Sequence, residues 1–155
     1  MINVGVLGAT GAVGSMMLQV LEEKKFPVGN LKLYASSRSK GKAIKFMGKE
    51  YIVEDADMAD FKGLDVVFGA VGNDLATKYA KKIVDAGALF IDNSSSFRMN
   101  PDVPLVVPEI NPEDIFKHKG IIANPNCSTI IALMGVAQLI NYQKLKRWLL
   151  PLIKQ

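Results

Sequence analysis

A glycine-rich segment, Gly8-Ala-Thr-Gly11-Ala-Val-Gly14, constrains this chain more than any other feature. It lies between an apolar run at residues 2–7, which predicts a strand, and an amphipathic stretch at residues 12–24, which predicts a helix. Glycines at such a junction permit a tight turn and let a pyrophosphate approach the backbone N–H groups at the start of the helix. The spacing is a variant of the usual Gly-x-Gly-x-x-Gly fingerprint. We therefore predict dinucleotide binding, with a structural turn as the alternative.

Strand-like and helix-like segments alternate along the rest of the chain. The pattern predicts further strands at residues 31–35, 64–70, 89–92, 105–107 and 120–123, a hairpin within 42–53, and helices at 74–86 and 130–139. This alternation indicates an α/β fold with a doubly wound, Rossmann-type, mostly parallel sheet. The side chains expected on one side of the first helix are Val13, Met16, Met17, Val20 and Leu21.

The composition narrows the classes of protein to which the chain can belong. With 155 residues, 49% hydrophobic and 22% charged, the chain has the size and make-up of a globular domain. The net charge of +4 comes from scattered Lys and Arg, which does not indicate a nucleic-acid partner. The single Cys excludes a disulfide within the chain, and together with the single His it argues against a zinc cluster. With no apolar run long enough for a membrane span and no signal-type segment, we expect a cytoplasmic protein.

The loop after the second predicted strand indicates which nicotinamide cofactor binds. An NAD site usually has an acidic residue there, whereas this chain has Ser36-Ser37-Arg38-Ser39. A guanidinium and neighbouring hydroxyls suit the 2′-phosphate of NADP, because they offer a fixed charge and several donors. The alternative is a solvated polar loop. We predict NADP, held here by Ser36, Arg38 and Ser39.

A second polar cluster follows another predicted strand, in Asp92-Asn-Ser-Ser-Ser-Phe97-Arg98. Amide and hydroxyl groups before an arginine can hold a phosphate or carboxylate through charge-assisted hydrogen bonds. Alone, such a segment is more often a polar turn. Beside a cofactor loop, Arg98 becomes a candidate anion ligand.

The single cysteine lies in Asn124-Pro-Asn126-Cys127-Ser-Thr-Ile130, where an apolar run gives way to a helical pattern. A cysteine at a helix N-terminus faces unpaired N–H groups and the positive end of the helix dipole, which favour the nucleophilic thiolate. The alternative is a small buried core residue. The Asn-Pro-Asn turn and the Ser-Thr pair, taken as helix caps, favour a catalytic nucleophile.

Together, the segments GATGAVG, Ser-Arg-Ser, DNSSSFRM, VPLVVPEIN and NPNCSTI resemble the bacterial aspartate-β-semialdehyde dehydrogenases, from Met1 to about Arg147. The resemblance implies that Cys127 forms an acyl thioester and that Arg98, with Asn126, binds the substrate phosphate. The resemblance implies that Thr10, Gly11, Ala12, Val13, Arg38 and Ser39 hold the cofactor. With the loop glycines and Ser36, the predicted cofactor-binding residues are Gly8, Thr10, Gly11, Ala12, Val13, Gly14, Ser36, Arg38 and Ser39. The related N-acetyl-glutamyl-phosphate reductases carry a Pro-Gly-Cys-Tyr-Pro-like setting, from which Asn-Cys-Ser-Thr departs.

The implied reaction is the NADPH-dependent reduction of L-aspartyl 4-phosphate to L-aspartate 4-semialdehyde. It leads to lysine, through diaminopimelate, and to methionine and threonine. The family resemblance also implies homo-oligomers about twice this length, with a later domain for substrate binding and dimerisation. That domain supplies a histidine base, a glutamine and a carboxylate-binding arginine, so we expect this chain to be inactive alone.

The expected organisation is a NADP-binding domain at residues 1–127, the start of the catalytic domain at 128–147, and an aberrant tail at 148–155. With suitable codons, the tail read one base earlier from Arg147 gives Val-Val-Val-Thr-Thr-Tyr-Gln-Ala, which resembles the missing family strand. This motivates the hypothesis of a single-base deletion. Sequencing the gene tests it: a downstream region with no Ser-Gly-Ala-Gly continuation in another frame would contradict the hypothesis.

Three interpretations remain open at this point. The chain is an enzyme by ancestry, or a cofactor-binding fragment without chemistry, or half of a split enzyme whose other half is encoded separately. A purely structural or interaction protein is the least supported, because the glycine loop and Cys127 would both be coincidences.

Overall fold

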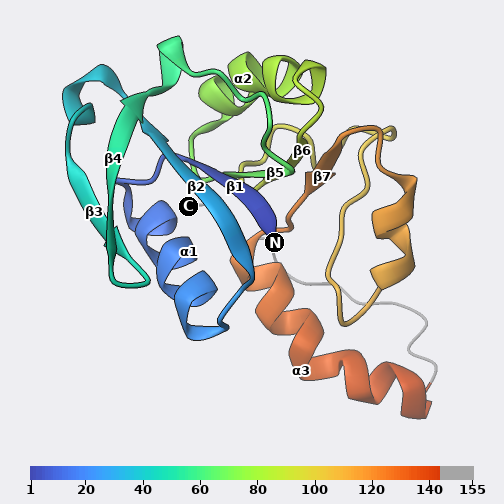
Figure 1. The fold of residues 1–155 in the computed structure, drawn as a ribbon. Coiled ribbons are helices and arrows are strands. Elements are labelled where there is room, and N and C mark those ends of the chain that lie inside the picture. The colour runs from blue at the N-terminus through green and yellow to red at the C-terminus, as the bar shows by residue number, and fades with distance from the viewer. Residues whose placement is uncertain (144–155) are drawn as a thin grey trace.

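The computed structural model describes residues 1–143, which form one seven-stranded sheet with helices packed against it (Figure 1). The strands are β1 (Ile2–Leu7), β2 (Val28–Ala35), β3 (Ala43–Phe46), β4 (Lys49–Asp55), β5 (Val66–Gly69), β6 (Leu89–Asp92) and β7 (Ile121–Ala123). They lie in the order β3-β4-β2-β1-β5-β6-β7. Every neighbouring pair is parallel except β3 and β4, which form an antiparallel hairpin.

The strand order confirms the predicted doubly wound α/β fold. From β1 the chain moves outward to β2 and β4, then returns to the other side of β1 and continues through β5, β6 and β7. The order reverses beside β1, so the loops on either side of it diverge and leave a crevice at the carboxyl ends of the strands. Dinucleotides bind in such crevices in open α/β sheets.

Three α-helices accompany the sheet: α1 (Ala12–Glu23), α2 (Asn73–Asp85) and α3 (Cys127–Gln143). Short 3-10 turns cover Ser37–Ser39, Ala56–Met58 and Pro112–Lys117. Alternate strand residues enter two separate apolar cores, as expected when side chains point to opposite faces of a sheet. Leu33 packs in the core that contains Leu18 of α1, whereas its neighbour Tyr34 packs in the core that contains Ile83 of α2.

Aromatic side chains tie α2 to the sheet. The rings of Tyr34 and Phe61 have centroids 5.0 Å apart, and those of Phe61 and Tyr79 are 6.5 Å apart, both edge to face. This geometry is favourable for aromatic pairs beyond the area that they bury. Tyr79 is thereby held at one end of the crevice, close to the segment that follows β4.

The predicted elements agree with the structure, with two corrections to the strands and one to the last helix, which spans Cys127–Gln143 rather than residues 130–139. The second strand begins at Val28 rather than at residue 31. Residues 105–107 do not form a strand; a single bridge joins Leu105 to Ala123. Asn111 explains the irregular backbone, because its side chain accepts from Val107 N–H and donates to Leu105 O.

The predicted apolar side of α1 is confirmed, but it is not the side that packs in the core. Gly14 and Leu18 are the buried residues of this helix, whereas Val13, Met16 and Val20 are 46%, 56% and 43% exposed. Gly14 has no side chain, so the helix lies close to the loop before it. The line from Gly14 to Leu18, one helical turn apart, therefore faces the sheet.

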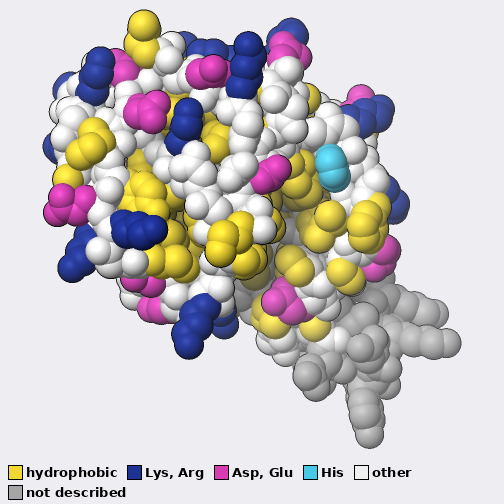
Figure 2. Space-filling view, viewed as in Figure 1, with side chains coloured by type: hydrophobic (Ala, Val, Ile, Leu, Met, Phe, Trp, Pro, Cys, Tyr) yellow, Lys and Arg dark blue, Asp and Glu magenta, His cyan; other side chains and the backbone are white. Residues whose placement is uncertain are grey.

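The charged side chains of both signs are scattered over the face seen in Figure 2 and form no basic block there. Within residues 1–143 no helix is long and apolar enough to span a membrane. The expected domain boundary at 147/148 and the tail beyond it lie outside the described residues.

Candidate functional site

The predicted site residues gather at the carboxyl edge of the parallel strands. Gly8 follows β1, Ser36 follows β2, Asn93 follows β6 and Asn124 follows β7. Residues far apart in sequence therefore share one edge of the sheet, as this topology dictates.

Two glycines build a tight backbone cradle between β1 and α1. Gly8 has φ +87°, and a Cβ added to it would lie 2.3 Å from the carbonyl oxygen of Ala70. A Cβ on Gly14 would lie 2.2 Å from the carbonyl oxygen of Gly8. Any larger residue would have to displace backbone at both positions, so the glycines here are a requirement of packing.

Gly11 serves a different purpose in the cradle. It is the N-cap of α1, is exposed, and donates its N–H to Gly8 O at 3.0 Å. The first N–H groups of a helix have no acceptor within the helix and carry the positive end of its dipole. The open side of Gly11 leaves these donors accessible to an anion such as a pyrophosphate.

A pocket of about 380 Å³ joins this cradle to the predicted 2′-phosphate loop. Its lining includes the predicted cofactor residues Gly8, Thr10, Gly11, Ser36 and Arg38. Thr10 Oγ1 also donates to Ser39 Oγ at 3.3 Å, which links the two loops directly. The remaining predicted residues lie elsewhere: Gly14 is packed inside, and Ala12 and Val13 line a separate apolar groove.

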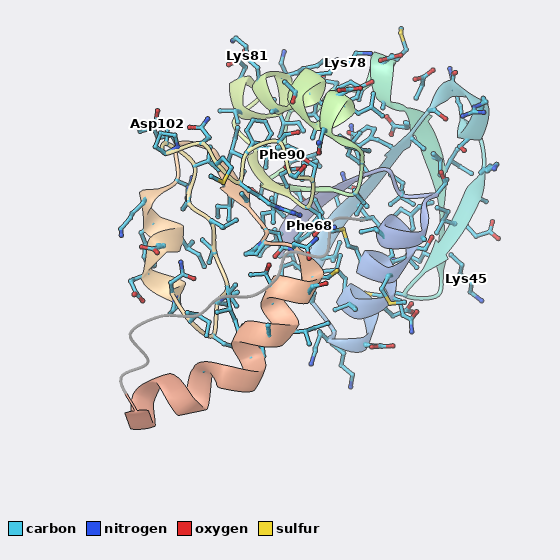
Figure 3. All side chains as sticks on the ribbon, turned by 180° about the vertical axis from the view of Figure 1, so that it is seen from behind. Lys45, Phe68, Lys78, Lys81, Phe90 and Asp102 are labelled. Carbon is cyan, nitrogen blue, oxygen red and sulfur yellow. The ribbon has the colours of Figure 1, made fainter. Side chains whose placement is uncertain are left out.

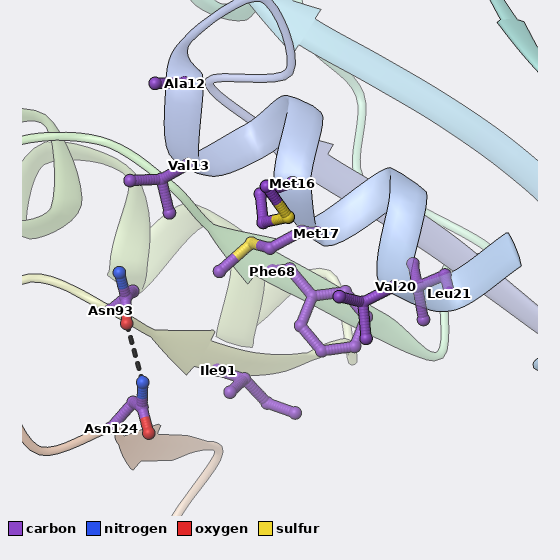
Figure 4. Close-up of a pocket in the computed structure, with 10 residues that line it drawn as sticks. All are labelled: Ala12, Val13, Met16, Met17, Val20, Leu21, Phe68, Ile91, Asn93 and Asn124. Atoms are coloured by element: carbon purple, nitrogen blue, oxygen red, sulfur yellow. Dashed lines mark hydrogen bonds between the residues drawn. The ribbon is translucent and has the colours of Figure 1, made fainter. Parts of the chain in front are cut away.

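That apolar groove has a volume of about 570 Å³ and runs between α1 and the sheet (Figure 4). It is lined by the α1 side chains that the sequence predicted on one side of the helix, together with Phe68 and Ile91. Asn93 and Asn124 close one end, joined by a hydrogen bond from Asn124 Nδ2 to Asn93 Oδ1 of 2.6 Å.

Arg98 joins the loops that follow β6 and β7. Its Nε donates to the carbonyl oxygen of Asn124 at 2.9 Å, and its Nη2 donates to that of Asn93 at 3.1 Å. Asn124 precedes Cys127 by three residues, so this cation is held beside the segment that carries the thiol. A guanidinium has five N–H donors, which leaves further donors for a ligand.

The serines before Arg98 serve the protein itself. Ser94 Oγ donates to the buried carboxylate of Asp92 at 2.6 Å. Ser95 and Ser96 bond to Asn73 at the start of α2. Of the predicted anion-binding cluster, Arg98 therefore remains the candidate.

Cys127 is exposed and is the first residue of α3, so the alternative of a buried core thiol is wrong. The predicted capping by Ser128 and Thr129 is also wrong, because both lie inside the helix. Asn126 is the cap: its Oδ1 accepts from Ser128 N–H at 2.9 Å and lies 3.9 Å from Cys127 Sγ. Asn side chains are good caps because a short carbonyl can reach the N–H two residues on.

One cluster in the 380 Å³ pocket was not predicted from the sequence. Lys78 Nζ and Tyr79 Oη both donate to Asp57 Oδ1. The Lys78 bond lowers the pKa of Asp57, and the same bond raises the pKa of Lys78. Partial burial, followed by the bond to Asp57, raises the pKa of Tyr79. Only the topology brings α2 next to the turn after β4, so no local pattern could have revealed this cluster.

The one histidine of the sequence, His118, is used structurally: its Nδ1 accepts from Gly120 N–H at 3.0 Å. The part of the chain that the structure describes holds no group of three or more His, Cys, Asp or Glu side chains placed to bind a metal ion.

A Rossmann-order sheet with a glycine cradle at its switch point defines a dinucleotide-binding domain. Residues 3–118 match the family model described as "semialdehyde dehydrogenase, NAD binding domain". The chain belongs to that family.

Relatives extend the similarity beyond the matched domain. The aspartate-semialdehyde dehydrogenase of Aquifex aeolicus is 50% identical over 148 residues, which cover 94% of this chain and 44% of the relative. The Vibrio cholerae aspartate-semialdehyde dehydrogenase II complexed with ASA is 45% identical, with a TM-score of 0.89, over 91% of this chain and 47% of that chain. The Candida albicans enzyme with NADP is 31% identical, with a TM-score of 0.76, over 92% and 47%. The chain thus spans less than half the length of these relatives.

The cradle predicts that alanine destabilises the fold by different amounts at two of its glycines. Gly14→Ala should lower the free energy of unfolding by about 1–3 kcal/mol, because its Cβ would overlap backbone. Gly11→Ala should cost no more than about 1 kcal/mol, because its Cβ meets nothing nearer than 3.4 Å. Urea unfolding of the two variants measures both values. Equal losses would contradict the proposed packing.

Proposed function

We propose that this chain is the cofactor-binding and cysteine-bearing part of an aspartate-semialdehyde dehydrogenase. The reaction is the NADPH-dependent reduction of L-aspartyl 4-phosphate to L-aspartate 4-semialdehyde. The observation that carries the proposal is the placement of exposed Cys127, at the start of α3, on the same sheet edge as the glycine cradle. The identity of 50% to an enzyme of that name supports the substrate.

The pocket favours NADP over NAD. Strand β2 ends at Ala35, and Ser36 and Arg38 follow in the pocket lining, where an NAD site usually has a carboxylate. An exposed guanidinium can bind a 2′-phosphate bidentately, whereas the 2′-hydroxyl of NAD would leave it without an anionic partner. The similar Candida albicans structure is described as containing NADP.

In the first chemical step Cys127 acts as the nucleophile. Its thiolate attacks the acyl carbon of the aspartyl phosphate, a C–S bond forms, and the C–O bond to phosphate breaks. Arg98 stabilises the departing phosphate, because its guanidinium is fixed by two backbone carbonyls and keeps donors free. Asn126 lies beside the sulfur and can donate through its amide nitrogen while its oxygen caps α3.

The second step releases the product from the cysteine. NADPH, when bound, supplies the hydride that reduces the thioester carbon. The C–S bond then breaks with its electrons on sulfur, so Cys127 leaves as the thiolate and the aldehyde is free.

The chain alone is proposed to bind cofactor without turning over. The resemblance assigns the histidine base to a domain beyond these residues, and His118 is engaged by Gly120. Groups that act as a catalytic unit lose most of their effect when one is missing. The cofactor-binding fragment and the split-enzyme half are therefore two forms of one proposal, distinguished by whether a second chain restores activity.

The setting of the reaction follows from the same proposal. We place the full enzyme in the cytoplasm, on the route to lysine, methionine and threonine, as a homo-oligomer with small-molecule substrates and no nucleic-acid or membrane partner.

Titration with NADPH and NADH, followed by nicotinamide fluorescence, tests the proposal. NADPH should bind more tightly than NADH, and Arg38→Met should weaken NADPH binding about 10- to 100-fold, as expected for loss of a charge-assisted hydrogen bond. NADH binding should change little. Lys45→Met, which removes an exposed positive charge on β3 (Figure 3), is the matched control and should leave both affinities unchanged.

The same preparation then receives aspartate semialdehyde, phosphate and NADP. No NADPH should appear, since the resemblance assigns the catalytic base to a domain beyond these 155 residues. Turnover would overturn the account of the missing residues, and failure to bind either cofactor would overturn the proposed function itself.

A further inference from the structure

We propose that Asp57 and Lys78 recognise the adenine ring of the cofactor by its amino edge and so select adenine over 6-oxopurines. The inference rests on the proposed cofactor function and deepens it. The starting observation is the position of both side chains in the pocket that contains the glycine cradle and Arg38.

The pocket has the layout of an adenosine site. The cradle at Gly8 and Gly11 accounts for the pyrophosphate end and Arg38 for the ribose phosphate. The lining also includes the apolar residues Ala70, Val71 and Leu75 and the charged side chains of Asp57 and Lys78. Leu75 is 44% exposed, which leaves its side chain available to a ligand. Apolar side chains and a flat purine face suit one another, so the base belongs beside these apolar residues.

The hydrogen bonds within the cluster leave one acceptor open. Both the Lys78 ammonium and the Tyr79 hydroxyl donate to Oδ1 of Asp57. Among the residues that the structure describes, none donates to Oδ2 of Asp57. The Asp57 side chain is 62% exposed, so that oxygen can accept from a ligand.

Lys78 presents the complementary donor. An ammonium has three protons, of which one is committed to Asp57, and the side chain is 54% exposed. Tyr79 orients the pair, since its ring is fixed by Phe61 and lies 5.1 Å from the Lys78 nitrogen. An acceptor and a donor, joined to each other, thus stand side by side in the pocket lining.

This pattern matches the Watson–Crick edge of adenine. The 6-amino group donates and the neighbouring N1 accepts, which suits the carboxylate of Asp57 and the ammonium of Lys78. In hypoxanthine the positions are reversed: O6 accepts and N1 carries a proton. That base would set an acceptor against a carboxylate and a donor against an ammonium, which is unfavourable at both contacts.

The test compares NADPH with its reduced hypoxanthine analogue, which differs only in the purine. Both are titrated against the 155-residue chain by nicotinamide fluorescence. We expect NADPH to bind about tenfold or more tightly, because a site built to bond a donor rejects the analogue that lacks it. Asp57→Asn should bring the ratio of affinities towards one, since an amide can turn a donor to O6. Lys78→Met should lower the affinity for NADPH and also reduce the ratio.

Two control variants keep charge changes separate from recognition. Asp102→Asn and Lys81→Met remove exposed members of other ion pairs, with Lys119 and Asp85. Lys81 lies on α2 with Lys78, and Figure 3 labels both lysines and Asp102. Neither control should change the affinity ratio.

The outcomes separate this inference from the proposed function. Equal binding of the two cofactors by the unaltered chain would overturn adenine recognition while leaving NADPH binding intact. A Lys78→Met effect confined to NADPH over NADH would place that lysine at the 2′-phosphate and also overturn it. Binding of neither cofactor would overturn the proposed function and this inference together.

Discussion

The contact between Gly14 and the carbonyl of Gly8 sets the geometry on which the site depends. A backbone approach that leaves no room for a Cβ brings the start of α1 against the end of β1. The free N–H groups of the helix then face the crevice at the switch point of the sheet. The same approach turns Gly14 and Leu18 towards the sheet and leaves the apolar side of α1 lining an open groove.

Arg98 has a comparable role on the other side of the crevice. Without Arg98, the Asn93–Asn124 hydrogen bond and the backbone hydrogen bonds of the strands would be left to join the loops after β6 and β7. By donating to a carbonyl of each loop, it couples the segment before Cys127 to the sheet edge. In the proposed reaction one side chain therefore both positions the nucleophile and meets the phosphate that leaves.

The sequence predicted what local patterns encode and missed what depends on tertiary contact. The alternation of elements, the glycine junction and a helix start close to Cys127 each follow from short segments, and the strand order agrees with them. The apolar side of α1 was predicted correctly, but apolar periodicity does not tell a core from a groove. The use of Ser94 by Asp92 and the meeting of Asp57 with Lys78 depend on distant elements, so no pattern in their own segments signals them.

The most direct test of the account is an NMR titration of the ¹⁵N-labelled chain with NADPH, with assigned backbone amides. At 16.9 kDa the chain suits the method. Cofactor binding at the glycine cradle should give the largest shifts at Gly8, Thr10, Gly11 and residues 36–39, with smaller changes along β3 and the far ends of the strands. Shifts centred on the groove between α1 and Phe68, or none at the glycine loop, would contradict it.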